Sequence, residues 1–462
     1  MPESLLNKIH NFPEAKAILA EQIRTFAAEA SKRTGPAPVL KRFEIRVEKM
    51  DLLAWLSQQR SATKIFGSDQ SENYAIAGIG EADVITGAGP VNHEMIDQKI
   101  RPCLPPQYPY LRYYGGFSFD PLNPGTEWDD FGTYRFLIPR FELATKEGKY
   151  LLACTVLLKS ADPGTWEKIL KELETLTYAN YNFVVQPLEM VIREDDPDRQ
   201  GWEDMIGTIL ASIRTDECRK IVLARKTRFT FDKPLDPWLL FRQLKNVSPS
   251  SYHFCFQFNG GPVFLGASPE RLFKRTGRAI QSEAVAGTRS RGASHEKDGF
   301  LRQDLLASAK DQREHQFVVE AIQSHLGAVC NGTVQNAGTN ILSLESGHHL
   351  ITCLQGQLKE TVKDWQILDR LHPTPAVGGV PKEKAMEIIR SAEPFSRGWY
   401  AAPVGYIGND QTEFVVAIRS ALVRGSELVV YAGAGIVEGS VPGQEWEEVE
   451  NKIGNFLKVL HY

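Results

Sequence analysis

The sequence predicts an α+β fold with large, mainly antiparallel sheets flanked by helices. Two observations predict it: strand-like runs outnumber the strand–helix–strand units that a parallel sheet needs, and many neighbouring runs are separated only by short turns. The 462 residues are 42% hydrophobic and 24% charged, which is typical of globular proteins. A chain of this length can form a core that needs no disulfide or metal for stability.

The first half of the chain has short β-rich runs between two helical segments. Residues 1–33 are predicted to form a helix, and alternating apolar runs follow from Val39 to about Ile192. Residues 102–124 are rich in proline, tyrosine and glycine, and we expect a structured loop that leads into a strand. A second helix is predicted over Asp162–Leu176.

The charged turn Asp195–Gln200 is the best candidate boundary between the two halves. It divides the chain into an N-terminal α+β half, 1–195, and a second half, 196–462, that carries the candidate motifs. In the second half, alternating apolar residues predict strands over 220–231, 251–258, 262–268, 348–358, 413–425 and 427–435. Helical periodicity predicts helices over 202–215, 234–246, 303–326, 381–391 and 444–460.

Charge and cysteine content limit the possible partners and the compartment. The net charge of −4 argues against nucleic acid or an anionic membrane as the main partner. The six cysteines are widely spaced and contain no CxxC pair, which favours a reducing cytoplasm over a disulfide framework or a zinc ribbon. No heptad or obvious apolar patch indicates assembly, so we expect a monomer.

Acidic side chains gather on two predicted helices. Asp311 and Glu314 are three residues apart, and Glu445, Glu448 and Lys452 follow one another at spacings of three and four. Such carboxylates suit Mg²⁺, which commonly takes one or two of them together with water and an anionic substrate group. A solvated helix face with a Glu448–Lys452 pair explains the same pattern, and spacing alone does not decide between the two.

Two further residues have the setting of an acid and a base. Glu270 follows a strand end in LGASPE, where apolar surroundings raise a carboxyl pKa and suit a general acid. Lys220 opens the strand KIVLARK among apolar and cationic neighbours, which suits a base. Taken singly, Glu270 is equally explained as an ordinary turn residue, and Lys220 as an ordinary lysine at a strand end.

The glycine-rich segment YAGAGIVEGS at 431–440 is not a dinucleotide fingerprint. Its third glycine, Gly439, lies outside the GxGxxG spacing, and no helix follows directly. Close approach of its backbone to a small ligand stays open.

Taken together and in order, these segments resemble the chorismate-utilising enzymes, and within them the isochorismate synthase branch. The matching segments lie between about 200 and 460 and are KIVLAR, LGASPE, AVAGTRSRG, the Asp311–His315 region, HPTPA, VAIR and the stretch YAGAGIVEGSVPGQEWEEVENK. The first 190 residues match weakly, mainly through GGFSFDP at 115–121. Many colinear motifs make this resemblance specific.

The resemblance implies two intertwined subdomains and a Mg²⁺-dependent reaction at one site. It implies that Glu314 and Glu448 bind Mg²⁺, with Asp311 and Glu445 behind them. It also implies that Glu270 is the general acid and that Lys220 is the base. The residues that it implies around the substrate are Gly287, Thr288, His349, Arg419, Tyr431, Ala434, Gly435 and Lys452.

The implied reaction converts chorismate to isochorismate: water attacks C2 while the C4 hydroxyl leaves, without an obligatory glutaminase partner. Salicylate synthases share Lys220, Glu270 and the metal glutamates, and add a pyruvate elimination. Aminating relatives, the anthranilate and aminodeoxychorismate synthases, typically carry Gln at the position of Lys220. A catalytically silent binding subunit is a further alternative. The presence of the four key residues, Lys220, Glu270, Glu314 and Glu448, argues against it. Menaquinone, phylloquinone, siderophore and salicylate pathways all use isochorismate, and the sequence gives only a weak preference for the quinones.

Overall fold

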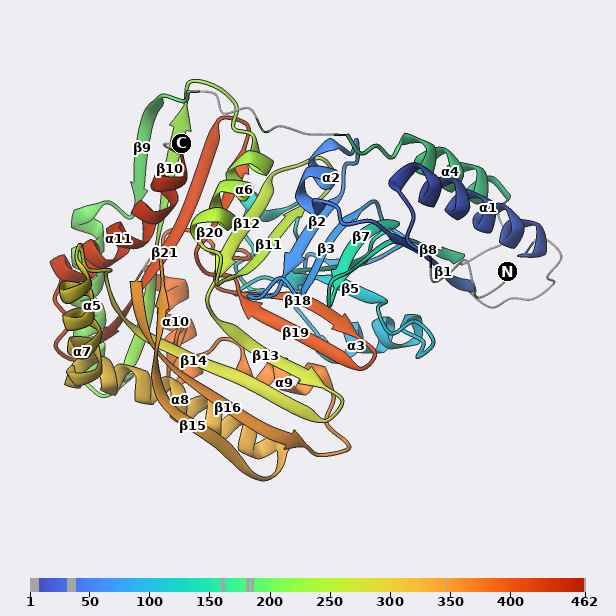
Figure 1. The fold of residues 1–462 in the computed structure, drawn as a ribbon. Coiled ribbons are helices and arrows are strands. Elements are labelled where there is room, and N and C mark those ends of the chain that lie inside the picture. The colour runs from blue at the N-terminus through green and yellow to red at the C-terminus, as the bar shows by residue number, and fades with distance from the viewer. Residues whose placement is uncertain are drawn as a thin grey trace.

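The computed structural model describes residues 8–30, 39–158, 163–179, 183, 187–345 and 347–460. Two large antiparallel sheets dominate this part of the chain, and helices flank them (Figure 1). Of the helix predicted over 1–33, residues 1–7 and 31–33 lie outside the described residues, and α1 covers Phe12–Ala30. Of the helix predicted over 162–176, residue 162 lies outside them, and α4 covers Pro163–Thr175. The predicted α+β class is confirmed.

The larger sheet has twelve strands among the described residues. Its order is β1-β8-β7-β3-β2-β11-β12-β20-β21-β10-β17, and β9 pairs with β10 off this path. The strands are β1 Val39–Val47, β2 Lys64–Ser68, β3 Tyr74–Ile79, β7 Phe141–Lys146, β8 Lys149–Leu158, β9 Met190–Asp196, β10 Lys220–Phe231, β11 Tyr252–Gln257, β12 Val263–Ser268, β17 Gly379–Val380, β20 Ser420–Arg424 and β21 Glu427–Val437.

The second sheet has nine strands in the described part of the chain, in the order β15-β16-β14-β13-β19-β18-β5-β6-β4. The strands are β4 Asp83–Gly87, β5 Arg112–Phe117, β6 Tyr134–Ile138, β13 Arg271–Thr276, β14 Ala279–Arg289, β15 Cys330–Leu344, β16 Gly347–Leu358, β18 Pro403–Gly408 and β19 Gln411–Val416. Both sheets take strands from before and after residue 195, through the pairs β2–β11 and β5–β18. This is the intertwined arrangement expected for the fold, whereas the boundary at residue 195 stays a prediction.

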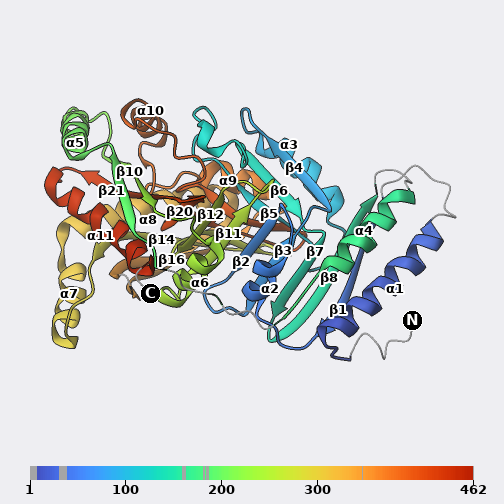
Figure 2. The same ribbon diagram turned by 90° about the horizontal axis from the view of Figure 1, so that it is seen from above.

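Helices cover the outer faces of the sheets. α8 packs on β14, β15 and β16, and α11 packs on β21 and contacts α5 and α6. Figure 2 shows α1 and α4 together beside β1 and β8, far from α11 at the other end of the molecule. The remaining helices are α2 Leu52–Gln58, α3 His93–Ile100, α5 Arg199–Arg214, α6 Pro237–Val247, α7 His295–Ala307, α8 Ala309–Val329, α9 Asp364–Leu371, α10 Lys382–Ala392 and α11 Pro442–Leu460, with short 3-10 turns at Arg101–Cys103 and Thr126–Trp128.

The prediction of one continuous helix over 303–326 was wrong, because two helices cover this range. The chain forms α7 and α8, and Ser308 between them has an extended conformation with φ −69° and ψ 112°. The Ser308 hydroxyl accepts a hydrogen bond from the Asp311 amide, so it caps the N-terminus of α8. Apolar periodicity runs through this break because both helices bury residues against the same sheet.

The single strand predicted over 413–425 was also wrong. β19 ends at Val416 in one sheet, and β20 begins at Ser420 in the other. Between them Arg419 has a left-handed backbone, with φ 50°. This crossover brings Arg419 to the junction of the two sheets, where the candidate site lies.

Among the described residues, no helix is both long and apolar enough to cross a membrane.

Candidate active site

A cavity of about 110 Å³ lies where the two sheets meet α8 and α11. Ten of the residues predicted for the site line it: Glu270, Gly287, Thr288, Glu314, His349, Arg419, Tyr431, Gly435, Glu448 and Lys452. These residues come from seven separate elements and turns, so the fold brings together what the sequence distributes over more than 180 residues. Convergent polar groups in a buried cavity are typical of a binding or catalytic site.

Lys220 is the first residue of β10 and is fully buried. Side chains alternate along a strand, so Lys220 shares a face with Val222, which lines the cavity. Its Nζ lies 3.0 Å from Glu314 Oε1. No described residue accepts a well-aligned hydrogen bond from this Nζ. Lys220 is not itself among the described residues that line the cavity, but its amine lies directly behind Glu314, which is.

Glu270 lies in the turn between β12 and β13, and 2% of its surface is exposed. The turn is fixed by Ser268, whose hydroxyl donates to the Val416 carbonyl at 2.6 Å and accepts from the Glu270 amide at 3.2 Å. Burial raises the pKa of Glu270 to about 8, and the negative charge of Glu283 adds to this effect, against the opposing effect of Lys220. Glu270 therefore carries a proton at neutral pH, and its Oε1 has no partner among the described residues.

Glu448 and Glu314 approach the cavity from α11 and α8. Burial raises the pKa of Glu448, but Lys452 and then Lys310 and Lys220 more than offset this, and the net shift is downward. Glu448 is therefore ionised at neutral pH. Lys452 Nζ donates to Glu448 Oε1 at 2.8 Å and to the Gly433 carbonyl at 2.7 Å, which ties α11 to β21.

The carboxylates of Glu314 and Glu448 fit Mg²⁺ as a pair of protein ligands that water and substrate would complete. The described residues contain no group of three or more His, Cys, Asp or Glu side chains that could hold a metal ion. Glu314 and Glu448 supply two carboxylates at one cavity, and Mg²⁺ often takes one or two from the protein and fills its other positions with water and substrate.

Asp311 and Glu445 are buried but do not line this cavity. Asp311 Oδ2 lies 2.8 Å from Arg289 Nη2, and Glu445 Oε1 lies 3.0 Å from Lys310 Nζ. Burial, followed by the charge of Glu448, raises the pKa of Glu445. Both carboxylates hold cations beside the cavity, an arrangement in keeping with a supporting role.

Position 435 on β21 requires glycine because the Glu314 side chain lies close to its backbone. A Cβ at this position would lie 2.4 Å from Glu314 Oε1 and 3.1 Å from Lys220 Cε. Gly287 has φ 68° and lies where the pairing of β14 with β16 shifts register between Ala286 and Thr288. The glycines thus let backbone replace side chains at two walls of the cavity.

Arg419 and His349 form a cationic and a neutral group side by side. Arg419 Nη2 donates to His349 Nε2, and His349 Nδ1 lies 3.3 Å from the Gly287 carbonyl and 3.1 Å from Thr288 Oγ1. Burial lowers the pKa of His349 well below its usual value, and Arg419 and Lys452 lower it further. The imidazole is therefore neutral, with its proton on Nδ1 and its Nε2 as acceptor.

Of the two predicted site residues Tyr431 and Ala434 on β21, only Tyr431 lines the cavity. Tyr431 lines the cavity and stacks on Tyr400, with ring centroids 5.4 Å apart. Its hydroxyl donates to Glu127 Oε2 at 3.4 Å, and burial raises its pKa well above the usual value. Ala434 is buried but is not among the described residues that line the cavity.

Several lining residues were not predicted from the sequence. Gly433 and Val222 have a recognisable signal, since strand alternation places them on the same face as Gly435 and Lys220. Tyr400 and Phe456 have no such signal, because only the tertiary fold brings them to the cavity.

A wider cleft of about 560 Å³ adjoins the cavity and shares five lining residues with it: Thr288, His349, Arg419, Glu448 and Lys452. Arg199 and Arg289 add positive charge to this cleft. Clustered cations in a cleft attract anions.

A buried protonated acid, a buried lysine, two carboxylates on the cavity wall and neighbouring cations define an enzyme site for a small anionic substrate. Residues 25–461 match the family described as "Chorismate binding enzyme". The chain belongs to this family.

Named relatives and a solved structure agree with the family. The chain is 36% identical over 407 residues to isochorismate synthase 2, chloroplastic, of Arabidopsis thaliana, covering 86% of this chain and 72% of the relative. It is 36% identical over 352 residues to isochorismate synthase MenF of Bacillus subtilis, covering 75% and 74%. The structure of MenF, the menaquinone-specific isochorismate synthase from Escherichia coli, matches with a TM-score of 0.85 at 29% identity, covering 97% of this chain and all of that one.

Proposed function

We propose that this protein converts chorismate to isochorismate, with Glu270 as general acid and Lys220 as general base. The observation that carries the proposal is the position of these two buried groups at one site: Glu270 lines the cavity and has an unpartnered Oε1, and Lys220 contacts Glu314, which lines the same cavity. The names of the relatives in Arabidopsis and Bacillus support the same reaction.

The reaction replaces one hydroxyl by another. Lys220, as the base, accepts a proton from a water molecule whose oxygen bonds to C2 of the ring. The ring double bond migrates, and the bond from C4 to its hydroxyl oxygen breaks. Glu270 donates its proton to that oxygen, which leaves as water, so that one water enters and one departs. Each proton transfer of this kind contributes about 10²- to 10⁴-fold to the rate.

The cationic wall orients the two carboxylates of the substrate. Arg419 presents the planar donors that match a carboxylate, and Lys452 adds a second positive charge. Glu314 and Glu448 would hold Mg²⁺, which when bound neutralises the carboxylate on the ring. The glycine backbone at 287 and 435 leaves room for the ring close to these groups.

The broader context is part of the same proposal. We expect the enzyme to use water without a glutaminase subunit, because a base at Lys220 is needed for water and not for ammonia. The six described cysteines are all free, which supports a reducing cytoplasm. A quinone pathway is favoured because the Escherichia coli neighbour is menaquinone-specific. A monomer is expected.

Product analysis tests the proposal. The protein is incubated with chorismate and Mg²⁺, with and without ammonia and with an EDTA control, and the products are separated with mass detection. A metal-dependent isomer of unchanged mass supports the proposal. Salicylate with pyruvate would instead assign the salicylate synthase reaction, and a product formed only with ammonia would overturn the role of Lys220.

A further inference from the structure

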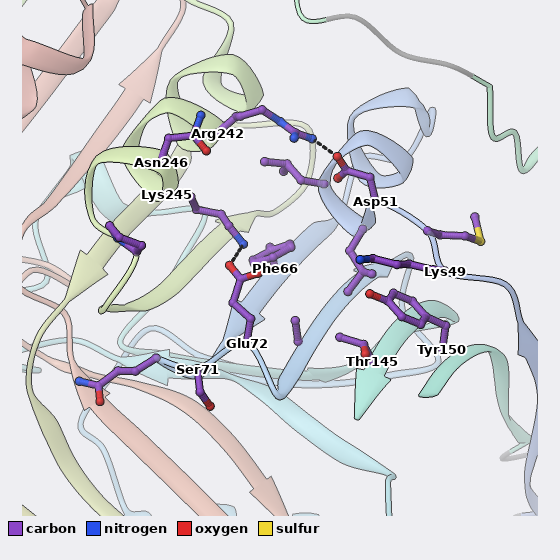
Figure 3. A pocket seen from close by; sticks show the side chains of 16 residues that line it. Lys49, Asp51, Phe66, Ser71, Glu72, Thr145, Tyr150, Arg242, Lys245 and Asn246 are labelled. Carbon is purple, nitrogen blue, oxygen red and sulfur yellow. Dashed lines mark hydrogen bonds and ion pairs between the residues drawn. The ribbon is translucent and has the colours of Figure 1, made fainter. Parts of the chain in front are cut away.

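A second and larger cleft lies away from the candidate active site, between α2 and α6 (Figure 3). We name it the α2–α6 cleft. Its volume is about 1040 Å³, and it shares no described lining residue with the cavity that holds Glu270. The lining residues come from 49–53, β2, the β2–β3 connection, the edges of β7 and β8, and the end of α6 through Pro249. This volume accommodates a small organic ligand.

The charged side chains of the α2–α6 cleft are mostly paired. Arg242 Nη2 lies 2.6 Å from Asp51 Oδ2, and Lys245 Nζ lies 2.7 Å from Glu72 Oε1. Figure 3 shows the Arg242–Asp51 pair in the upper part of the view and the Lys245–Glu72 pair below and to the left of it, beside Phe66. The three cations and two carboxylates of the lining leave one positive charge, on Lys49.

Lys49 has no ion-pair partner among the described residues, although it lines a cleft that contains two carboxylates. Its amine lies on the same wall as the hydroxyls of Tyr150 and Thr145 (Figure 3). An ammonium on the same wall as two hydroxyls offers several hydrogen-bond donors, which suits a carboxylate.

The floor of the α2–α6 cleft is apolar. Leu52, Leu53, Phe66 and Ala75 lie beneath the charged rim, and each is at most 7% exposed. Lys245 Nζ lies 4.5 Å from the centre of the Phe66 ring, which holds this lysine against the floor and away from Lys49. The floor therefore favours an apolar ligand body, next to the Lys49 ammonium, which has no ion-pair partner in the described part of the chain.

We propose that the α2–α6 cleft binds a small monocarboxylate with an apolar body, its carboxylate at Lys49 and Tyr150 and its body on the floor formed by Leu52, Leu53 and Phe66. This inference goes beyond the proposed reaction and does not depend on it. The α2–α6 cleft is connected to the candidate active site through α6, which packs against α11, the helix that carries Glu448 and Lys452.

Calorimetry and ligand-observed NMR with 3-phenylpropionate test the proposal, with the neutral 3-phenylpropionamide as a matched probe. The acid binds the full-length protein and the amide binds at least tenfold more weakly. Lys49→Gln weakens binding of the acid about tenfold, since Lys49 is the charged residue of the described lining that has no ion-pair partner. Lys49→Arg restores most of the affinity. Lys171→Gln, at an exposed lysine of α4, leaves it unchanged.

Two further measurements separate this cleft from the candidate active site, which also attracts carboxylates. Arg419→Gln leaves binding of 3-phenylpropionate intact, and excess chorismate does not displace the probe. Displacement by chorismate, loss of binding in Arg419→Gln, equal affinity for the amide, or no binding of the acid to the wild-type protein would each overturn the proposal. Retained binding in a folded Lys49→Gln variant would do so as well.

Discussion

Lys220 Nζ lies 3.0 Å from Glu314 Oε1, so the proposed base touches a proposed metal ligand. Each side chain therefore fixes the position of the other. The lysine is fully buried, whereas the glutamate reaches the cavity, which makes the pair asymmetric in its access to a ligand.

Lys220→Ala is expected to reduce kcat about 10²- to 10⁴-fold, because the attacking water loses its base. Glu314→Gln is expected to weaken Mg²⁺ activation, because one anionic ligand is lost. Steady-state rates over a Mg²⁺ titration measure both effects. An unchanged Mg²⁺ titration in a folded Glu314→Gln variant would contradict the metal role.

The pKa of Glu270 has a consequence for activity. This residue must be protonated to act as an acid, and its pKa is raised to about 8. Turnover is therefore expected to fall as the pH rises through about 8. A pH–rate profile measures this, with rates taken at saturating chorismate and Mg²⁺. A rate that still rises well above that pH would count against Glu270 as the acid.

The same pKa has a consequence for stability. Between the ordinary pKa of 4.5 and about 8, the folded protein keeps a proton on Glu270 that the unfolded chain releases. The contribution of Glu270 to stability thus falls as the pH rises through this interval. Glu270→Gln lacks this loss, and its stability relative to wild type is expected to increase by on the order of 4 kcal/mol from pH 4.5 to pH 8. Urea unfolding at both ends measures it, and a difference independent of pH would refute the buried-acid assignment.

Gly435→Ala is expected to reduce activity at least tenfold, because its Cβ would lie 2.4 Å from Glu314 Oε1 and force that carboxylate to move. Gly207→Ala on α5 is the matched control, since a Cβ there meets nothing within 4 Å. The control is expected to keep full activity and to gain up to about 1 kcal/mol of stability. Equal activity of both variants would show that Gly435 is not needed for close approach.

Arg419→Lys is expected to raise KM for chorismate about tenfold or more, because lysine lacks the planar pair of donors. Arg424→Lys, at the exposed end of β20, serves as the control and is expected to leave KM unchanged. Initial rates over a range of chorismate concentrations measure both. A normal KM for Arg419→Lys would remove Arg419 from the substrate cradle.

Sequence patterns predict the local elements and the chemistry better than the connections between them. The strand at Lys220 and the helix of Glu448 were found because alternation and helical spacing are local properties. The turn at Arg419 was missed, since the apolar run continues through it while the chain changes sheets. The break at Ser308 was missed for a similar reason, because one capping hydroxyl outweighs an unbroken periodic pattern.

The α2–α6 cleft has no sequence signal. Its walls come from segments as far apart in the sequence as Lys49, Tyr150 and Arg242. The sequence does not show which of the charged side chains are neutralised by an ion pair, as Arg242 is by Asp51. The active-site residues were recognisable because they lie in colinear motifs.

The pairing of β2 with β11 and of β5 with β18 has a consequence for synthesis of the chain on the ribosome. When the first 195 residues have emerged, both sheets still lack neighbours for these strands, and their backbone donors and acceptors stay open to water or to other chains. The last of these partners, Pro403–Gly408, is made long after β5. Completion of both sheets therefore waits for these later strands, and until they are made the nascent chain carries open strand edges of the kind that favour aggregation.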